Sequence, residues 1–247
     1  MLTNKISNWL KEYLETSNLD SFVIGVSGGI DSAVTSTLSA MTGKKTIVVS
    51  MPIHQKENEL NRAHNHMKWL SEKFDNVEVL EFDLTQLYET FRLMWIDEVN
   101  NLALANSRSR LRMVTLYQIA TINKGLVVGT GNKVEDFGVG FYTKYGDGGV
   151  DISPIADLTK TQVRELAREL GVNQEIIDAP PTDGLWEDGR SDEDQIGATY
   201  EELEWAMEYK GGDITERQKE VLDIYNKFHN QNLHKMNPIP IFSVNSK

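Results

Sequence analysis

Short apolar runs rich in β-branched residues alternate with longer helical stretches along the first half of the chain. The runs cover residues 22–26, 46–50, 77–82 and 126–129, and each is typical of a strand buried on both faces. Helical patterns fill residues 31–41, 56–73 and 84–123, the last in at least two pieces. This alternation predicts right-handed crossovers and an α/β fold, a doubly wound parallel sheet flanked by helices.

The rest of the chain adds helices but no second domain. Apolar residues between Leu2 and Leu14 recur at helical spacing, and a helix beginning near Thr159 has a capping box with Gln162 and a stop at Gly171. A last helix is expected at 215–231, with Val221, Ile224, Tyr225 and Phe228 on its buried side, and 182–197 has the composition of a long loop. Because no repeat or low-complexity linker divides the 247 residues, one domain spanning 1–247 is the simplest prediction.

Composition excludes several function classes. Without any cysteine the chain has no disulfide, thiolate zinc site, iron–sulfur cluster or cysteine nucleophile. The net charge of -12 argues against nucleic acid and anionic membranes as partners, since both attract basic surfaces. No stretch approaches the 18 apolar residues of a membrane span and the start does not resemble a signal peptide, so a cytoplasmic protein is expected.

The negative charge is concentrated in one segment. Residues 183–223 carry 14 acidic and four basic side chains, a net of -10, which leaves -2 for the rest of the chain. Residues 106–170, by contrast, hold nine Lys plus Arg against seven acidic residues. The net negative charge of the chain is therefore compatible with a locally basic pocket formed by residues 106–170.

The segment FVIGVSGGIDSAV, residues 22–34, predicts a phosphate-binding loop. A strand ends at Val26, a turn passes through Ser27, Gly28 and Gly29, and a helix starts near Asp31, so the unpaired N–H groups of the helix face an anion. The loop has neither the lysine of GxxxxGK[ST] nor the spacing of GxGxxG. A carboxylate beside phosphates repels them unless a divalent cation bridges the two, which makes Asp31 a candidate Mg²⁺ ligand.

A second motif, VVGTGNKVEDFGVGFYTKYGDGGVDISPIADLTKTQVREL, fills residues 127–166. It follows a predicted strand, so its start lies at the carboxyl edge of the sheet, where open α/β sheets bind ligands. Glu135 could supply a second carboxylate to the cation near Asp31. Lys144, Asp147 and Asp151 lie on a glycine-rich loop, and Lys160 opens a capped helix that could help to hold phosphate.

SGGIDS resembles the signature of ATP pyrophosphatases, which split ATP into AMP and pyrophosphate while activating an oxygen nucleophile. GFYTKYGDGG, NSRSRLRM at 106–113 and the pair His234-Lys235 are similar to motifs of the NAD synthetase family, in particular its short ammonia-dependent form. The resemblance covers about 19–238. It implies the adenine nucleotide alpha-hydrolase-like fold, a homodimer with contributions from the 84–123 helices, and no glutaminase domain.

The resemblance also implies residue roles. Asp31 and Glu135 would ligate Mg²⁺, and Asp147 and Lys160 would be catalytic, with Asp147 orienting or deprotonating ammonium. The residues expected to bind ATP are Gly25, Val26, Ser27, Gly28, Gly29, Ile30, Asp31, Ser32, Met51, Gln55, Arg112, Thr130, Lys160 and Thr182. Those expected to bind deamido-NAD are Asn106, Arg110, Lys144, Asp147, Asp151, His234 and Lys235. Gln55 lies closer to Pro52 than in relatives, and Ser50 stands where some relatives have Arg.

The reaction implied is the last step of NAD biosynthesis. The nicotinate carboxylate of deamido-NAD attacks the α-phosphorus of ATP, and ammonia then displaces AMP from the acyl-adenylate to give NAD. Two alternatives stay open: another ATP-pyrophosphatase amidotransferase or thiolase, and a nucleotide-binding module without catalysis. The paired carboxylates Asp31 and Glu135 favour an enzyme, because a binding module has less need of a metal site.

Overall fold

The computed structural model describes residues 1–95, 100–182 and 191–244. Its centre is a four-stranded parallel sheet in the order β3-β2-β1-β4. The strands are β1 (Ser21–Gly25), β2 (Lys45–Ser50), β3 (Val77–Glu81) and β4 (Gly125–Val127). Phe22 of β1 lies opposite Thr46 of β2 on one side and Leu126 of β4 on the other. The predicted parallel sheet is confirmed, with strand ends shifted by one or two residues.

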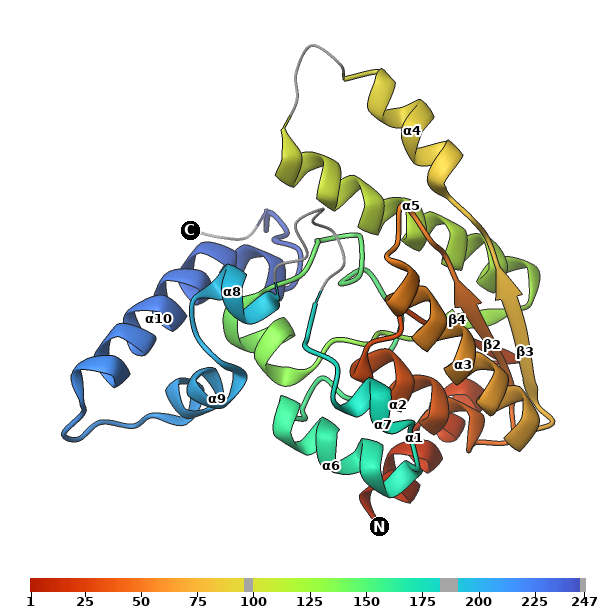
Figure 1. Cartoon of the computed structure of the whole chain (residues 1–247), viewed down its shortest axis with the longest axis horizontal. Coiled ribbons are helices and arrows are strands. Elements are labelled where there is room, and N and C mark those ends of the chain that lie inside the picture. Colours follow the sequence, from red (N-terminus) through yellow and green to blue (C-terminus); the bar gives the residue numbers. More distant parts are fainter. Residues whose placement is uncertain (96–99, 183–190, 245–247) are drawn as a thin grey trace.

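Helices cover both faces of the sheet (Figure 1). Phe22 and Ile24 of β1 pack in one apolar cluster with α1 (Leu2–Thr16), α2 (Ile30–Ala40) and α6 (Lys160–Leu170). Val23, between them, points the other way and packs with residues of α4 (Thr85–Leu93) and α5 (Asn101–Ile122). Helix α3 (Glu57–Lys73) packs on β2 beside α2. Since successive strand residues face opposite sides, β1 contacts a helical layer on each face, as the centre of a doubly wound sheet requires.

Strand β3 departs from the prediction of burial on both faces. Val79, at its centre, is 41% exposed, and none of the five residues of β3 is fully buried. The strand lies at the edge of the sheet and pairs only with β2, with Val77 opposite Thr46. The apolar run was wrongly interpreted as an interior strand because apolar content does not reveal which strand is at an edge.

The C-terminal part confirms the helix predicted at 215–231, which extends to Met236 as α10 (Glu216–Met236), and adds four short elements that the sequence reading did not include. These four are the π-helix η1 (Val134–Val139), α7 (Gln174–Ile177), α8 (Asp192–Ile196) and α9 (Tyr200–Glu208). Figure 1 shows α8, α9 and α10 as a group beside the sheet domain, and with η1 they form a separate apolar cluster around Tyr200, Leu203 and Val221.

The loop predicted at 182–197 is partly wrong. Residues 183–190 lie outside the described residues, but α8 follows with Ser191 as its N-cap and a capping box to Asp194. Helix α9 has the same device, with Thr199 as N-cap and Glu202 at the third helical position. Both boxes are visible in the sequence, but the acidic composition hid the periodicity that marks a helix.

The strand order creates a ligand-binding edge. From β1 the chain runs outward through β2 to β3, and β4 then adds to the opposite side of β1. The loops that leave β1 and β4 therefore diverge from neighbouring strands at the carboxyl edge, which is the usual binding crevice of such sheets. Across the described residues, no helix has the length and hydropathy needed to cross a membrane.

The two histidines of His64-x-His66 face different surroundings. His64 Nε2 pairs with the Glu81 carboxylate at the surface, whereas His66 is buried and its Nε2 lies 2.9 Å from Ser36 Oγ on α2. Burial lowers the pKa of His66 to about 4, so this histidine is neutral in the folded protein.

The buried His66 predicts a specific loss of stability in acid. The unfolded state takes up a proton near pH 6.5 and the folded state only near pH 4, so the free energy of unfolding falls as pH drops between these values, by up to about 3 kcal/mol. Urea unfolding of wild type and His66→Gln at pH 7, 5.5 and 4.5 measures this contribution. The variant is expected to lose less stability in acid than wild type. Identical pH dependence of the two proteins would contradict the assignment.

Candidate active site

The phosphate loop joins β1 to α2. Gly28 has a φ of +84°, and a Cβ atom there would lie 2.5 Å from the Glu59 carbonyl oxygen, so the turn requires glycine and packs closely against α3. Gly29 is the N-cap of α2 and contributes no side chain. Ser27 Oγ and Ser32 Oγ lie 3.2 Å apart at the same turn. Residues 25–32 thus form the predicted cradle at a helix N-terminus, where unpaired N–H groups attract anions.

A buried ion cluster stands beside this loop. Lys160 Nζ lies 2.5 Å from Asp31 Oδ2 and 3.0 Å from Glu135 Oε1, and the Lys160 side chain is only 3% exposed. The three residues lie in the first turns of three elements: α2, η1 and α6. The structure therefore brings together the two predicted metal ligands and the predicted phosphate-binding lysine, although Asp31 is 129 residues from Lys160 in the sequence.

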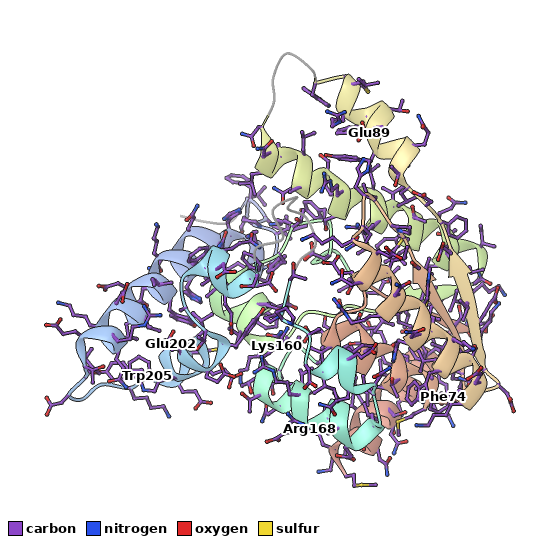
Figure 2. The ribbon with its side chains drawn as sticks, in the orientation of Figure 1. Phe74, Glu89, Lys160, Arg168, Glu202 and Trp205 are labelled. Carbon is purple, nitrogen blue, oxygen red and sulfur yellow. The ribbon has the colours of Figure 1, made fainter. Side chains whose placement is uncertain are left out.

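Two further residues complete the cluster. Tyr200 donates a hydrogen bond from its hydroxyl to Glu135 Oε1 at 2.5 Å, and its ring lies 4.6 Å from Lys160 Nζ. Asn132 donates from Nδ2 to Asp31 Oδ1 at 3.3 Å. In Figure 2 Lys160 is labelled between the α8–α10 group and the helices that pack on the sheet. Sequence reasoning missed Tyr200, because no local signal connects an acidic C-terminal segment to the phosphate loop.

One ammonium facing two carboxylates explains the protonation behaviour. Burial alone would lower the pKa of Lys160, but the charges of Asp31 and Glu135 outweigh it and raise that pKa above its ordinary value. Burial and the like charge of Glu135 raise the pKa of Asp31 against the opposing effect of Lys160. For Glu135 the charge of Lys160 and the Tyr200 hydroxyl outweigh burial and lower the pKa. Lys160 is thus a fixed positive charge.

A small polar cavity of about 160 Å³ opens onto the cluster. Its lining includes Ser27, Gly29, Asp31, Ser32 and Lys160, so it is the space in which the phosphate loop meets the ion cluster. Asp136 also lines it, and burial together with the charges of Glu135, Asp147 and Asp31 raises the pKa of Asp136 well above the ordinary range. Asp136 packs against Gly131, where a Cβ would lie 2.2 Å from its carboxylate, and it was not singled out from the sequence.

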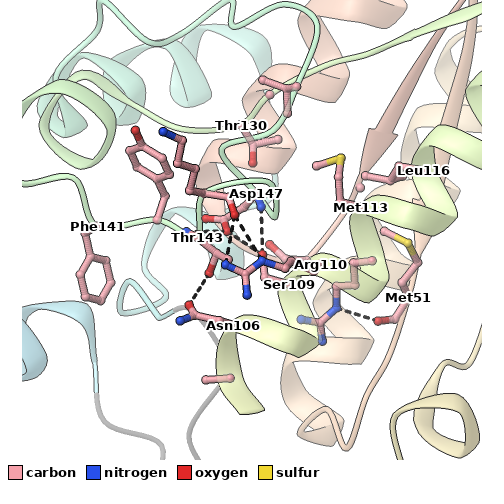
Figure 3. A pocket seen from close by; sticks show the side chains of 18 of the residues that line it. Met51, Asn106, Ser109, Arg110, Met113, Leu116, Thr130, Phe141, Thr143 and Asp147 are labelled. Carbon is pink, nitrogen blue, oxygen red and sulfur yellow. Dashed lines mark hydrogen bonds between the residues drawn. The ribbon is translucent and has the colours of Figure 1, made fainter. Parts of the chain in front are cut away.

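A larger cavity of about 650 Å³ adjoins the first, with Ser27, Thr130, Asp147 and Thr182 among the residues that line both. At one end Arg112 donates from Nε to the Met51 carbonyl oxygen at 3.0 Å and from a terminal nitrogen to Gln55 Oε1 at 3.1 Å. Met113 and Leu116 supply an apolar wall there (Figure 3). The predicted adenine-side residues are therefore brought together in spite of the altered spacing around Gln55.

Asp147 lies at the junction of the two cavities. Its Oδ1 accepts hydrogen bonds from Ser109 Oγ at 2.6 Å and from the Thr143 N–H at 3.0 Å. Thr143 in turn donates to Asn106 Oδ1 at 2.7 Å, and Figure 3 shows these side chains in one connected group. Desolvation raises the pKa of Asp147 even though these hydrogen bonds oppose it. Ser109 and Thr143 position the carboxylate and were missed from the sequence.

The remaining predicted dinucleotide contacts lie between the glycine-rich loop and α10. Lys144 Nζ donates to the His234 carbonyl oxygen at 2.9 Å, and Lys235 Nζ donates to the Tyr142 carbonyl oxygen at 2.7 Å. Arg110 donates to the Lys144 carbonyl oxygen at 3.3 Å. All four residues line the larger cavity.

Asp151 stands apart from this group. Its carboxylate accepts from Tyr117 at 3.0 Å and from the Val127 N–H of β4 at 2.8 Å, and it lines neither cavity. The structure thus places Asp151 as a tie between α5, β4 and the following loop, not beside the other predicted dinucleotide contacts.

Comparison with known proteins identifies the family. Residues 2–238 match the NAD synthase family. An NH(3)-dependent NAD(+) synthetase of Carboxydothermus hydrogenoformans is 37% identical over 94% of this chain and 93% of its own length. Among solved structures, the NMN synthetase from Francisella tularensis has a TM-score of 0.88 and 33% identity, covering 97% of this chain and 96% of its own. The NAD+ synthetase from Burkholderia pseudomallei has a TM-score of 0.73 and 25% identity, covering 94% and 89%.

These likenesses confirm the resemblance, the fold class and the enzyme class predicted from the sequence. They bear on the whole domain, because every match above covers nearly all of this chain. The chain belongs to the NAD synthase family, whose ammonia-dependent members are ligases that form a C–N bond by ATP-dependent amidation of deamido-NAD.

Proposed function

We propose that this chain amidates deamido-NAD with ammonia at the expense of ATP, using residues of the two adjoining cavities. The observation that carries the proposal is the contact of Lys160 with Asp31 and Glu135 at the mouth of the phosphate loop. That arrangement puts a fixed cation and two carboxylates where a triphosphate would lie. The larger cavity next to it has room and polar groups for the second nucleotide.

The first step is adenylation of the nicotinate carboxylate. A carboxylate oxygen bonds to the α-phosphorus of ATP, the bond from that phosphorus to the bridging oxygen breaks, and pyrophosphate leaves with the electron pair. Positioning and charge neutralisation account for most catalysis of such transfers. The N-terminus of α2, Lys160 and the hydroxyls of Ser27 and Ser32 supply both without a covalent enzyme intermediate.

Asp31 and Glu135 are proposed to hold Mg²⁺. Both carboxylates contact the same ammonium, so their oxygen atoms lie close to one point. Hard oxygen donors beside phosphate are the ligands that Mg²⁺ prefers. When bound, the ion would neutralise charge on the phosphates. Within the described residues, no group of three or more acidic or histidine side chains is placed to hold a metal ion.

Amide formation is the second step, and Asp147 is proposed to receive the nitrogen donor. Ammonia attacks the acyl carbon, AMP leaves with the oxygen, and the surplus proton passes to a base. Asp147 lies between the phosphate-loop cavity and the larger cavity, and Ser109 and Thr143 fix its orientation. With no cysteine in the chain, we propose that free ammonia is used, by a single domain acting in the cytoplasm where ATP is supplied.

Removing either metal-binding carboxylate tests the adenylation site. Asp31→Asn and Glu135→Gln are each expected to lower pyrophosphate release about 100-fold or more, because the phosphates lose charge neutralisation. Pyrophosphate is measured in the presence of ATP, Mg²⁺, deamido-NAD and ammonium. Asp157→Asn is a matched control, since Asp157 forms an exposed ion pair with Lys133. Near wild-type rates in the Asp31 and Glu135 variants would refute the assignment.

A mononucleotide is the second candidate for the acceptor. It is favoured by the likeness to the NMN synthetase from Francisella tularensis, whose structure has a higher TM-score to this chain than the Burkholderia pseudomallei enzyme. An enzyme that forms NMN by amidation would adenylate nicotinate mononucleotide, which carries the same carboxylate but lacks the adenylate half. The chemistry proposed above is the same for both acceptors.

The size of the acceptor is decided by a direct comparison of the two substrates. We expect kcat/KM for deamido-NAD to exceed that for nicotinate mononucleotide at least about tenfold, because remote binding energy accelerates the chemical step. NAD and NMN are measured by chromatography at fixed ATP and ammonium. The reverse preference would make the protein an NMN synthetase and leave the roles of Asp31, Glu135 and Lys160 unchanged.

We also propose a homodimer that pairs through α5 and the end of α4. One side of α5 packs on the sheet through Met113 and Leu116, yet Val114 is 68% exposed and Ile122 70% exposed on the same helix. Leu93 and Met94 at the end of α4 are also exposed. Large exposed apolar side chains gathered on neighbouring elements are typical of an interaction surface, so a second copy is the occupant that the family resemblance suggests.

A charge placed on this surface is expected to separate the subunits. Val114→Glu should shift the molar mass measured by light scattering from twice 28.0 kDa to 28.0 kDa, because an unpaired buried carboxylate is costly. Val244→Glu introduces the same change at an exposed C-terminal site and should leave the mass unchanged. A wild-type protein of 28.0 kDa, or a Val114→Glu variant that stays dimeric, would contradict the proposed interface.

A further inference from the structure

The cations around the smaller cavity are not equally available to a substrate. Three basic residues line it: Arg62, Lys160 and Arg164. Lys160 pairs with Asp31 and Glu135, and Arg164 pairs with Glu201 at 2.6 Å. In the part of the chain that the structure describes, Arg62 has no carboxylate within ion-pair distance.

Arg62 is attached to the phosphate loop itself. It lies on α3 and donates from Nε to the Gly28 carbonyl oxygen at 3.2 Å. At the same turn, α3 backbone atoms approach Gly28 so closely that a Cβ there would lie 2.5 Å from the Glu59 carbonyl oxygen. The neighbouring acid Glu59 accepts from the Gln55 amide, which itself contacts Arg112. Among the described residues Arg62 is therefore held at the loop by one donor, which leaves the other four N–H groups of the guanidinium for a ligand.

The charges near the loop call for such a group. Asp31, Glu135 and Lys160 together carry a net charge of -1 when all three are ionised, and the loop from Ser27 to Ser32 contains no basic residue. A triphosphate adds several further negative charges. Neutralising its far end needs a cation that is not already committed to protein carboxylates.

We propose that Arg62 binds the β- and γ-phosphates of ATP and remains bound to them as pyrophosphate leaves. This rests on the proposed function only for the presence of ATP at the phosphate loop. When the bond between the α-phosphorus and the bridging oxygen breaks, that oxygen takes the electron pair and the pyrophosphate gains negative charge. A guanidinium facing it stabilises this charge without accepting or donating a proton.

Product inhibition distinguishes this role from a structural one. Arg62→Ala is expected to raise the inhibition constant of Mg²⁺-pyrophosphate about tenfold or more, since hydrogen bonds to charged groups contribute this much to affinity. The inhibition constant of AMP, which lacks these phosphates, should stay within about twofold. Arg62→Lys keeps the charge but loses the planar guanidinium. Its inhibition constant for Mg²⁺-pyrophosphate should therefore lie between those of wild type and Arg62→Ala. Lys68→Ala, on the same helix with a surface pair to Glu72, is the matched control.

Two outcomes would overturn the proposal. An unchanged pyrophosphate constant in Arg62→Ala would show that the guanidinium does not touch the leaving group. An equal loss of pyrophosphate and AMP affinity would show that Arg62 only supports the loop. Direct titration of wild type and Arg62→Ala with Mg²⁺-pyrophosphate gives the same comparison without turnover. If wild type binds pyrophosphate through Arg62 but amidates neither acceptor, the proposed function fails and this inference stands.

Discussion

The contact of one buried ammonium with two carboxylates organises this molecule. Lys160 opens α6, Asp31 opens α2 and Glu135 lies in η1, so the cluster fixes three elements relative to one another at the carboxyl edge of the sheet. Buried ions of this kind are costly to desolvate and tend to be retained for a purpose other than stability. Here the purpose is a charged surface, which the phosphate loop faces across a small cavity.

The cluster also explains why the C-terminal segment belongs to the site. Tyr200 opens α9 and places its hydroxyl on Glu135, so the group of α8, α9 and α10 is connected to the phosphate loop through a single carboxylate. From there α10 runs back to the glycine-rich loop, where Lys235 and Lys144 each donate a hydrogen bond to a main-chain carbonyl oxygen. The C-terminal end of α10 thereby lines one side of the larger cavity with Asn232, His234 and Lys235.

Sequence reasoning predicted much of the site because the signals are local. The glycines and serines of residues 27–32 predict a turn before a helix, and the capping box at Thr159 places Lys160 at the start of a helix. Asp147, Arg112 and Gln55 were found by resemblance and come together at the cavities. Ser109, Thr143, Asn132 and Asp136 were missed, since a side chain that supports another across the fold has no signature of its own. Asp151 shows the converse, a motif residue whose carboxylate ties β4 to α5.

The sequence alone determined the parallel sheet, the phosphate loop and the family, because strand alternation, turn chemistry and motif spacing depend on residues that are close together in the sequence. The tertiary structure decided which strand lies at the edge, which residues surround Lys160, and which of the three cations at the smaller cavity has no carboxylate partner among the described residues. These depend on distances between segments far apart in the chain. Charge pairing in particular cannot be read from composition: Arg62 and Arg164 are both arginines on helices, and only their neighbours in space separate one from the other.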